Sequence, residues 1–202
     1  MSNITPYKNG SLTEVSGGLV ARPSTIALAL MNAEAMVLVD CSGSMGAEDA
    51  GPDSNRARYQ MAQEALDNLQ QAFPGKIAIV AFAGDQAGLV PDGVLPTPMG
   101  DTPMFRAMQE YYPKAISMKQ KFVLISDGEP TDNASGCIEL ARQYQYPIHA
   151  IFVGSGRDIN GGREFMQRLA SISGGEFDFV HVQKIHLLEK HIAGLLNSGG
   201  TA

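Results

Sequence analysis

The chain is poor in cysteine and contains no tryptophan. Its 202 residues include two cysteines, Cys41 and Cys137, and these do not form a C-x-x-C pair. A disulfide framework needs several cysteines, and zinc sites need clustered Cys or His ligands, so neither is indicated. We expect both thiols to be reduced, with Cys41 a small side chain packed beneath its loop rather than a reactive group.

Basic runs and long hydrophobic runs are also missing. The formal net charge is −6, and no cluster of Lys and Arg offsets it. A nucleic acid or an anionic membrane requires a basic surface, so neither is expected as a partner. The apolar segments fall short of the roughly 18 residues of a membrane span, and the first ten residues lack the apolar core of a signal peptide. We therefore expect a cytoplasmic protein.

Length and composition favour one folded domain with an extension. Hydrophobic residues make up 44% of the chain and charged residues 18%, as in ordinary globular proteins. The length suits a single α/β domain with a core on both faces of its sheet. We expect an N-terminal extension over 1–33, a domain over 34–197 and a flexible tail over 198–202. Asn9-Gly10 is typical of a hairpin turn, and we expect this hairpin to pack on the body and cover a sheet edge.

Four short apolar runs have the character of buried parallel strands. They cover residues 35–39, 77–82, 122–126 and 148–153. Runs that are apolar on both faces imply helices on both sides of the sheet. The expected helices cover 54–73, a stretch from Thr102 to near Pro113, 134–145, 162–172 and 184–196, with an edge strand over 177–182. The predicted fold class is α/β, a doubly wound, mostly parallel open sheet of Rossmann-like type.

Oxygen-bearing side chains follow the first of these strands. Asp40, Ser42 and Ser44 occupy alternate positions, so their side chains converge on one side of a tight turn between strand and helix. Carboxylate and hydroxyl oxygens suit the hard cations Mg²⁺, Mn²⁺ and Ca²⁺ better than Zn²⁺. The segment therefore predicts a site for a divalent cation.

Two further segments carry oxygen donors at comparable places. Thr102 precedes an expected helix, and Asp127 follows the apolar run at 122–126. In an open parallel sheet, ligands bind beyond the carboxyl ends of the strands, where the strand order reverses. We expect the strands that carry Asp40 and Asp127 to be neighbours at that point.

With these residues the chain resembles the von Willebrand factor A (VWA) domain family over roughly residues 34–197. That family has a metal-ion-dependent adhesion site (MIDAS), made of a D-x-S-x-S loop, a distant Thr and a distant Asp. The matching residues here are Asp40, Ser42, Ser44, Thr102 and Asp127. In the family one metal position is left for an outside ligand, usually a carboxylate of a partner protein. The resemblance implies a non-enzymatic adaptor that binds Mg²⁺, with Mn²⁺ or Ca²⁺ as alternatives.

The resemblance also implies roles and a partner. Ser42 and Ser44 would coordinate the metal directly, and Asp40 directly or through water. Thr102 and Asp127 would exchange direct and water-bridged roles between states of different affinity. Many intracellular relatives are prokaryotic and serve AAA+ ATPases of the MoxR type. The expected partner is therefore a protein that offers Asp or Glu to the metal, for instance within a MoxR-type AAA+ ATPase system.

Several acidic residues near the expected site have open roles. Asp101 stands where many relatives have Gly, and it could tighten the metal, repel an acidic ligand or, as we favour, face solvent. Glu129 could orient a metal-bound water from the second shell or the rim. Asp132 is expected to cap the helix that follows it. The acidic insert at 46–55 could form a partner-selecting rim or a plain solvated loop.

Two other functions are compatible with the motif. One is a metal-dependent phosphohydrolase with Asp40 as nucleophile. Ser42 stands where its second catalytic carboxylate is expected, and no Lys lies in either loop to neutralise phosphate. The sequence also lacks the glycine-rich phosphate loops and the G-x-S-x-G elbow of common enzymes. The other alternative is a scaffold whose metal site is purely structural.

Overall fold

The four apolar runs form the four central strands of a six-stranded sheet. The computed structural model describes residues 14–15, 18–19, 30–53, 55–155 and 161–197. The strands of the sheet are β3 (Ala35–Asp40), β4 (Ile77–Ala83), β5 (Gln86–Leu89), β6 (Lys121–Ser126), β7 (Ile148–Gly154) and β8 (Phe177–His181). Their order is β5-β4-β3-β6-β7-β8, and all neighbouring pairs are parallel except β4 with β5. The predicted doubly wound α/β fold is confirmed.

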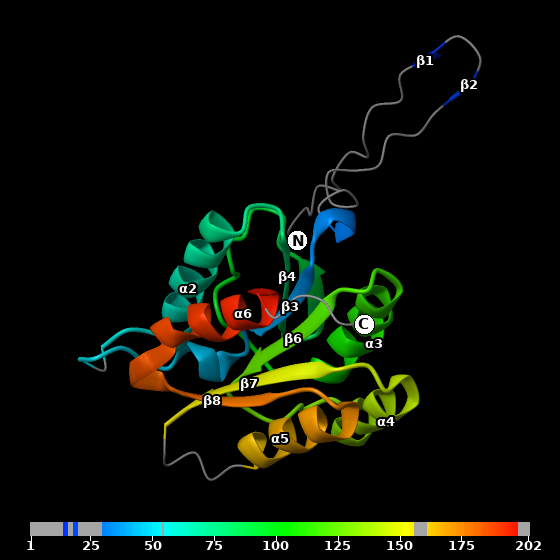
Figure 1. Ribbon diagram of the computed structural model, residues 1–202. Helices are drawn as coiled ribbons and strands as arrows, with labels where there is room; N and C mark the ends of the chain where they lie inside the picture. The colour runs from blue at the N-terminus through cyan, green and yellow to red at the C-terminus, as the bar shows by residue number, and fades with distance from the viewer. Residues whose placement is uncertain (1–13, 16–17, 20–29, 54, 156–160, 198–202) are drawn as a thin grey trace, which may run out of the picture.

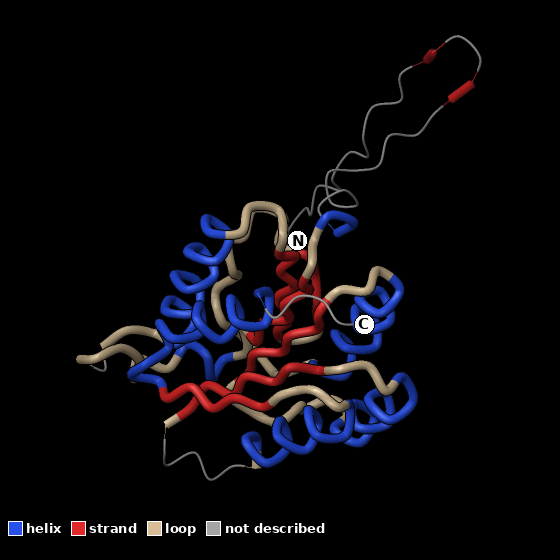
Figure 2. Tube along the Cα trace, in the orientation of Figure 1, coloured by secondary structure: helices blue, strands red, loops and turns tan. Residues whose placement is uncertain are grey.

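Helices cover both faces of this sheet (Figures 1 and 2). They are α2 (Arg58–Ala72), α3 (Met104–Ser117), α4 (Ala134–Tyr144), α5 (Gly162–Ser173) and α6 (Leu188–Asn197), with short 3-10 turns η1 (Gly43–Gly46) and η2 (Val182–Leu187). Because side chains alternate along a strand, each face has its own core. Val37 and Val39 pack with α2 and α6, whereas Met36 and Leu38 pack with α3, α4 and α5.

The chain order reverses between β3 and β6, which pair directly. Ala35 to Val39 lie opposite Lys121 to Ile125, in parallel register. From β3 the chain continues to β4 on one side, whereas β6 leads to β7 on the other. The carboxyl ends of β3 and β6 therefore open onto one edge of the sheet, where ligands bind in folds of this topology.

Three details of the sequence prediction were wrong. Strand β5 was missed because its four residues are partly exposed at the sheet edge and carry no apolar run. Helix α3 continues through Pro113 to Ser117, because buried Tyr112 and Ala115 hold its last turn against the core. Residues 55–57 are not helical, since Arg56 is held in a backbone bridge with Ala50.

The prediction that Asp132 caps the helix that follows it was also wrong, because Asp132 caps α3 instead. Asn133, not Asp132, caps α4 by accepting a hydrogen bond from the Gly136 amide. The Asp132 carboxylate instead accepts the amides of Phe105 (3.1 Å) and Arg106 (2.9 Å) in the first turn of α3. Asp132 therefore ties the loop after β6 to the start of the helix that follows Thr102.

The N-terminal part is described only in pieces. Two short strands, β1 (Glu14–Val15) and β2 (Gly18–Leu19), pair antiparallel. The predicted Asn9-Gly10 turn lies outside the described residues, as do most of 1–33 and the tail 198–202. Within the described chain, no helix combines the length and the hydropathy needed to cross a membrane.

We expect the substitution Asp132→Ala to lower the free energy of unfolding by about 1 kcal/mol, the usual value of a helix cap. Two amides at the start of α3 lose their acceptor, and the positive end of the helix loses a carboxylate. Urea unfolding of the metal-free protein measures the change. Asp85→Ala is a matched control, because Asp85 is exposed and its carboxylate makes no hydrogen bond within the described chain. Equal stability of the two variants would contradict the assignment.

Candidate metal-ion-dependent adhesion site

The first loop of the site is shaped by the carboxylate of Asp40. This residue ends β3, and its Oδ1 accepts the backbone amide of Ser42 at 2.8 Å. The bond closes a local turn of the kind that Asp favours, and η1 begins directly after it. The turn brings the hydroxyls of Ser42 and Ser44 within 3.1 Å of each other. The D-x-S-x-S spacing thus places two hydroxyls side by side.

Asp40 also joins the two central strands. Its Oδ2 accepts the hydroxyl of Ser126, the last residue of β6, at 2.6 Å. The Asp40 carboxylate is fully buried, so each of its oxygens is satisfied by a named donor. As predicted, the strands that carry Asp40 and Asp127 are neighbours.

The Thr102 segment is held against the first loop by backbone hydrogen bonds. Gly43 donates its amide to the Gly100 carbonyl at 3.0 Å, and Met99 donates to the Cys41 carbonyl at 3.0 Å. Gly100 has a φ of +62°, and a Cβ at this position would lie 2.8 Å from the Gly84 Cα. Only glycine fits this turn without strain. The turn delivers Thr102, which is buried, to the same edge of the sheet.

Thr102 is further fixed from the loop after β6. Its amide donates to the Thr131 hydroxyl at 3.0 Å, and its carbonyl accepts the Thr131 amide at 3.0 Å. Asp127 lies in the same loop, and its Oδ1 accepts the Ser44 hydroxyl at 2.7 Å. The structure therefore links Ser42, Ser44 and Asp127 in a hydrogen-bonded row, with Asp40 and Thr102 anchored to the same two loops.

The spacing of this row fits an octahedral cation. Neighbouring ligands on Mg²⁺, at about 2.0–2.1 Å from the ion, lie about 2.9 Å apart. The oxygen pairs Ser42–Ser44 and Ser44–Asp127 are 3.1 and 2.7 Å apart. Within the described chain, no three His, Cys, Asp or Glu side chains cluster in a way that would hold a metal. A cation here would therefore depend on hydroxyls, with Asp40 and Asp127 as its acidic ligands.

An arginine that the sequence analysis overlooked belongs to the site. Arg58 donates from Nη1 to Asp127 Oδ2 at 2.9 Å, and it forms a two-point ion pair with Asp49 at 2.8 and 2.6 Å. The hydrogen bond to Asp49 and the charges of both aspartates raise the pKa of Arg58, so it stays charged. The same hydrogen bond lowers the pKa of Asp49. A buried cation thus accompanies the buried carboxylate of Asp127.

Burial shifts the pKa values of the first loop upward. Desolvation, followed by the charge of Asp127, raises the pKa of Asp40 to about 6, although hydrogen bonds from Ser126 and Ser42 oppose the shift. Desolvation and the charge of Asp40 raise the pKa of Cys41 to about 12. Cys41 is free and fully buried, so it is an inert thiol beneath the loop.

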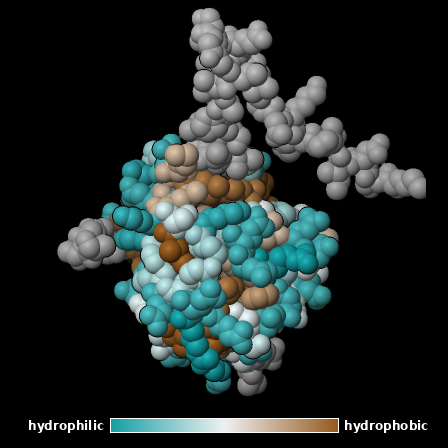
Figure 3. Space-filling view, turned by 90° about the vertical axis from the view of Figure 1, so that its right-hand side faces the viewer, coloured by the Kyte–Doolittle hydropathy of each residue, from teal (hydrophilic) through white to brown (hydrophobic). Residues whose placement is uncertain are grey.

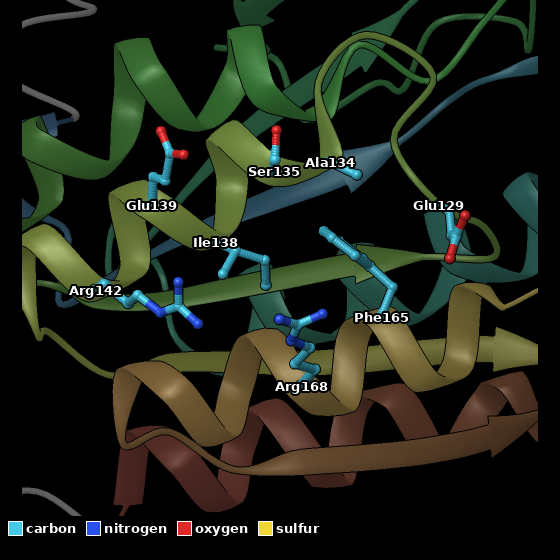
Figure 4. Close-up of a pocket in the computed structure, with 8 residues that line it drawn as sticks. All are labelled: Glu129, Ala134, Ser135, Ile138, Glu139, Arg142, Phe165 and Arg168. Atoms are coloured by element: carbon cyan, nitrogen blue, oxygen red, sulfur yellow. The ribbon is translucent and has the colours of Figure 1, made fainter.

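The two predicted outer residues lie apart from this row. Asp101 is exposed beside Thr102, and its carbonyl accepts the Gly84 amide at 2.9 Å. Glu129 lies at one end of a groove of about 320 Å³ between α4 and α5, which Arg142 and Arg168 also line (Figure 4). Within the described residues, no hydrogen bond or ion pair joins Glu129 to the five candidate ligands.

The residues that were overlooked left recognisable signals. Ser126 precedes Asp127 at the end of an expected strand, so a register argument would have placed it beside Asp40. Arg58 stands in the first turn of α2, where a positive charge opposes the helix dipole and so needs acidic partners. The insert is not a plain solvated loop, since Ala50 is fully buried and Gly51 donates its amide to the Val182 carbonyl.

The fold is a VWA-type, Rossmann-like α/β fold with the candidate site at its central strands. No family model and no curated protein matches the sequence. Solved structures share the fold. BatB of Bacteroides thetaiotaomicron is 15% identical with a TM-score of 0.56, covering 82% of this chain and 99% of that one. The SpRpn10 VWA domain is 14% identical with a TM-score of 0.53, covering 83% and 97%.

A further structural neighbour comes from a larger protein. A mutant of the PilB minor pilin from Streptococcus sanguinis is 13% identical with a TM-score of 0.58, covering 81% of this chain and 60% of that one. At these identities the likeness concerns the arrangement of helices and strands.

In metal-free protein we expect the free energy of unfolding to fall as the pH rises from about 4 to about 6. The pKa of Asp40 is about 6 in the folded state against an ordinary 3.8, so the folded state holds this proton more tightly than the unfolded state. The stability that the proton provides is lost as the pH rises through this window. Asp40→Asn keeps an oxygen that can accept the Ser42 amide but carries no charge.

At pH 7 the Asp40→Asn variant should therefore be more stable than the wild type in EDTA, by up to roughly 3 kcal/mol. Denaturant unfolding at several pH values measures both effects. If the free energies of unfolding of the two proteins changed with pH in the same way, the charged form of buried Asp40 would not destabilise the fold, and the prediction would be wrong.

Proposed function

We propose that the chain is a protein-binding module that uses a divalent cation, Mg²⁺ or a close substitute such as Mn²⁺ or Ca²⁺, to engage an Asp or Glu of a partner. The row of oxygens from Ser42 to Ser44 to Asp127 carries this proposal, because each neighbouring pair is spaced like two adjacent ligands of an octahedral ion. Asp40 and Thr102 would complete the protein ligands. Ser44 is exposed, so the row is open to solvent and to an incoming ligand.

The charge of the donor set favours an acidic outside ligand. Two carboxylates and three hydroxyls can neutralise a divalent ion but leave an octahedral position for another oxygen. Arg58 further offsets the charge of Asp127, so the metal would retain attraction for a carboxylate. An open metal position of this kind favours binding through the metal over a site that is closed and purely structural.

The surroundings of the site favour a protein over a small molecule. Met99, held to the first loop by its backbone, is 65% exposed, and Val94 in the same segment is 63% exposed. Both line a groove of about 590 Å³ along β5. Figure 3 shows one face of the molecule, on which hydrophilic residues predominate and hydrophobic residues form a band and smaller spots. Exposed apolar side chains beside a polar site are typical of protein interfaces.

The surroundings of Asp40 argue against a phosphohydrolase. Ser42 stands where the second catalytic carboxylate of such an enzyme is expected, and no Lys lies in either loop to neutralise phosphate. We therefore propose a non-enzymatic adaptor. The suggestion of a MoxR-type AAA+ ATPase system as the partner rests on the family resemblance alone, as does a cytoplasmic location.

We expect isothermal titration to detect saturable Mg²⁺ binding to the EDTA-stripped protein, weakened at least 100-fold in Asp40→Asn. The variant keeps the fold, so loss of binding reports on the missing charge. Glu139→Gln is the matched control, since it removes an exposed carboxylate from the α4/α5 groove and should bind Mg²⁺ like the wild type. Absence of saturable binding to the wild type at millimolar Mg²⁺ would contradict the proposal.

The binding function is tested separately with peptides. On an array of peptides that differ only in a central Asp, Glu, Asn or Gln, the wild type should bind the acidic members in Mg²⁺ and release them in EDTA. The Asp40→Asn variant should bind none. If Mg²⁺ binds but peptide binding does not depend on it, the metal site is structural and the adaptor proposal is wrong.

A further inference from the structure

Arg58 connects the acidic insert to the candidate metal ligand Asp127. Its guanidinium contacts Asp127 Oδ2 through Nη1 and both oxygens of Asp49 through Nε and Nη2. The Arg58 side chain is 10% exposed and that of Asp127 is fully buried. This arrangement is unlike a surface ion pair, because the two charged groups are held together away from water.

The position of the guanidinium is fixed from several directions. Asp49 binds it at two points, a geometry that constrains the planar fork of Arg more than a single contact does. The Arg58 amide donates to the Ala47 carbonyl at 3.2 Å, and Ala50 and Arg56 form the backbone bridge that closes the insert. The insert therefore acts as a support for Arg58.

The two oxygens of the Asp127 carboxylate have different partners. Oδ2 accepts from Arg58, whereas Oδ1 accepts from Ser44 and belongs to the oxygen row. A cation beside Ser44 would meet one oxygen of this carboxylate, since the other is engaged by a fixed positive charge. Mg²⁺ has octahedral coordination by six ligands, and a carboxylate usually binds it through one oxygen. Ca²⁺ has six to eight ligands and often binds both oxygens of a carboxylate.

We propose that Arg58 is a positioning residue that makes Asp127 a one-oxygen ligand, and that it thereby sets the preference of the site for Mg²⁺ over Ca²⁺. The inference rests on the proposed metal-binding function. The positive charge of Arg58 also weakens the binding of any divalent cation, but this effect is the same for both ions. The ratio of the two affinities therefore reports on the positioning role alone.

The experiment compares Mg²⁺ and Ca²⁺ affinities by isothermal titration for the wild type and Arg58→Met, which keeps an unbranched side chain without donors or charge. In the wild type Mg²⁺ should bind more tightly than Ca²⁺. In Arg58→Met the ratio of the Ca²⁺ to the Mg²⁺ dissociation constant should fall by about tenfold or more. Arg56→Met is the matched control, because Arg56 makes an exposed ion pair with Glu64 and should leave the ratio unchanged.

Unfolding of each variant in EDTA checks that it is folded, since the substitution removes the cation that pairs with the buried Asp127 carboxylate. If Arg58→Met does not fold, Arg58→Leu provides the test, because it also lacks donors and charge and should shift the ratio in the same direction. A ratio within about twofold of the wild type, or equal changes for both ions, would overturn the positioning role. A wild type that binds neither ion would overturn the proposed function, and the inference with it.

Discussion

The parallel pairing of β3 with β6 determines where the polar groups of the candidate site lie. The two strands are in register from Ala35 with Lys121 to Val39 with Ile125, so their carboxyl ends finish side by side. The hydrogen bond from Ser126 to Asp40 continues this pairing beyond the backbone ladder. The Asp127 loop and the D-x-S-x-S loop therefore leave the sheet together, with apolar side chains below them on both faces.

This placement makes the site electrostatically costly, and the surrounding residues offset the cost. Two carboxylates, those of Asp40 and Asp127, are buried close enough for the charge of one to raise the pKa of the other. Hydroxyl and amide donors satisfy Asp40, and Arg58 supplies a compensating charge to Asp127. A divalent cation would add the remaining positive charge. The two buried carboxylates destabilise the metal-free fold and thus favour cation binding. Asp49, which pairs with Arg58, extends the network to the insert.

Much of the fold could be predicted from the sequence because the strands are apolar on both faces and short. The four buried runs and the Phe177–His181 edge strand were located to within one or two residues. Strand β5 could not be, since it depends on pairing with β4 at an exposed edge. Helix α3 continues past Pro113 because tertiary packing outweighs the tendency of proline to end a helix. No local sequence pattern reveals this packing.

For the site, a motif located its loops but not its supporting contacts. Asp40, Ser42, Ser44, Thr102 and Asp127 lie in three segments that meet. Strand topology anticipated that the Asp40 and Asp127 segments are neighbours, whereas Thr102 was assigned through the family resemblance. The contribution of Arg58 depends on a contact 69 residues away in sequence, and the Asp132 cap on one 27 residues away. Such long-range polar contacts follow from the packing of whole elements, so the sequence indicates at most that Arg58 needs acidic partners and not which residues these are.

An anomalous difference map from crystals soaked in Mn²⁺, a close substitute for Mg²⁺ with a usable anomalous signal, would locate the cation directly. We expect a single strong peak beside the Ser42 and Ser44 hydroxyls, with Asp127 contributing one oxygen and Arg58 still bound to the other. No peak at this position, or a peak at another site only, would show that these residues do not form a cation site.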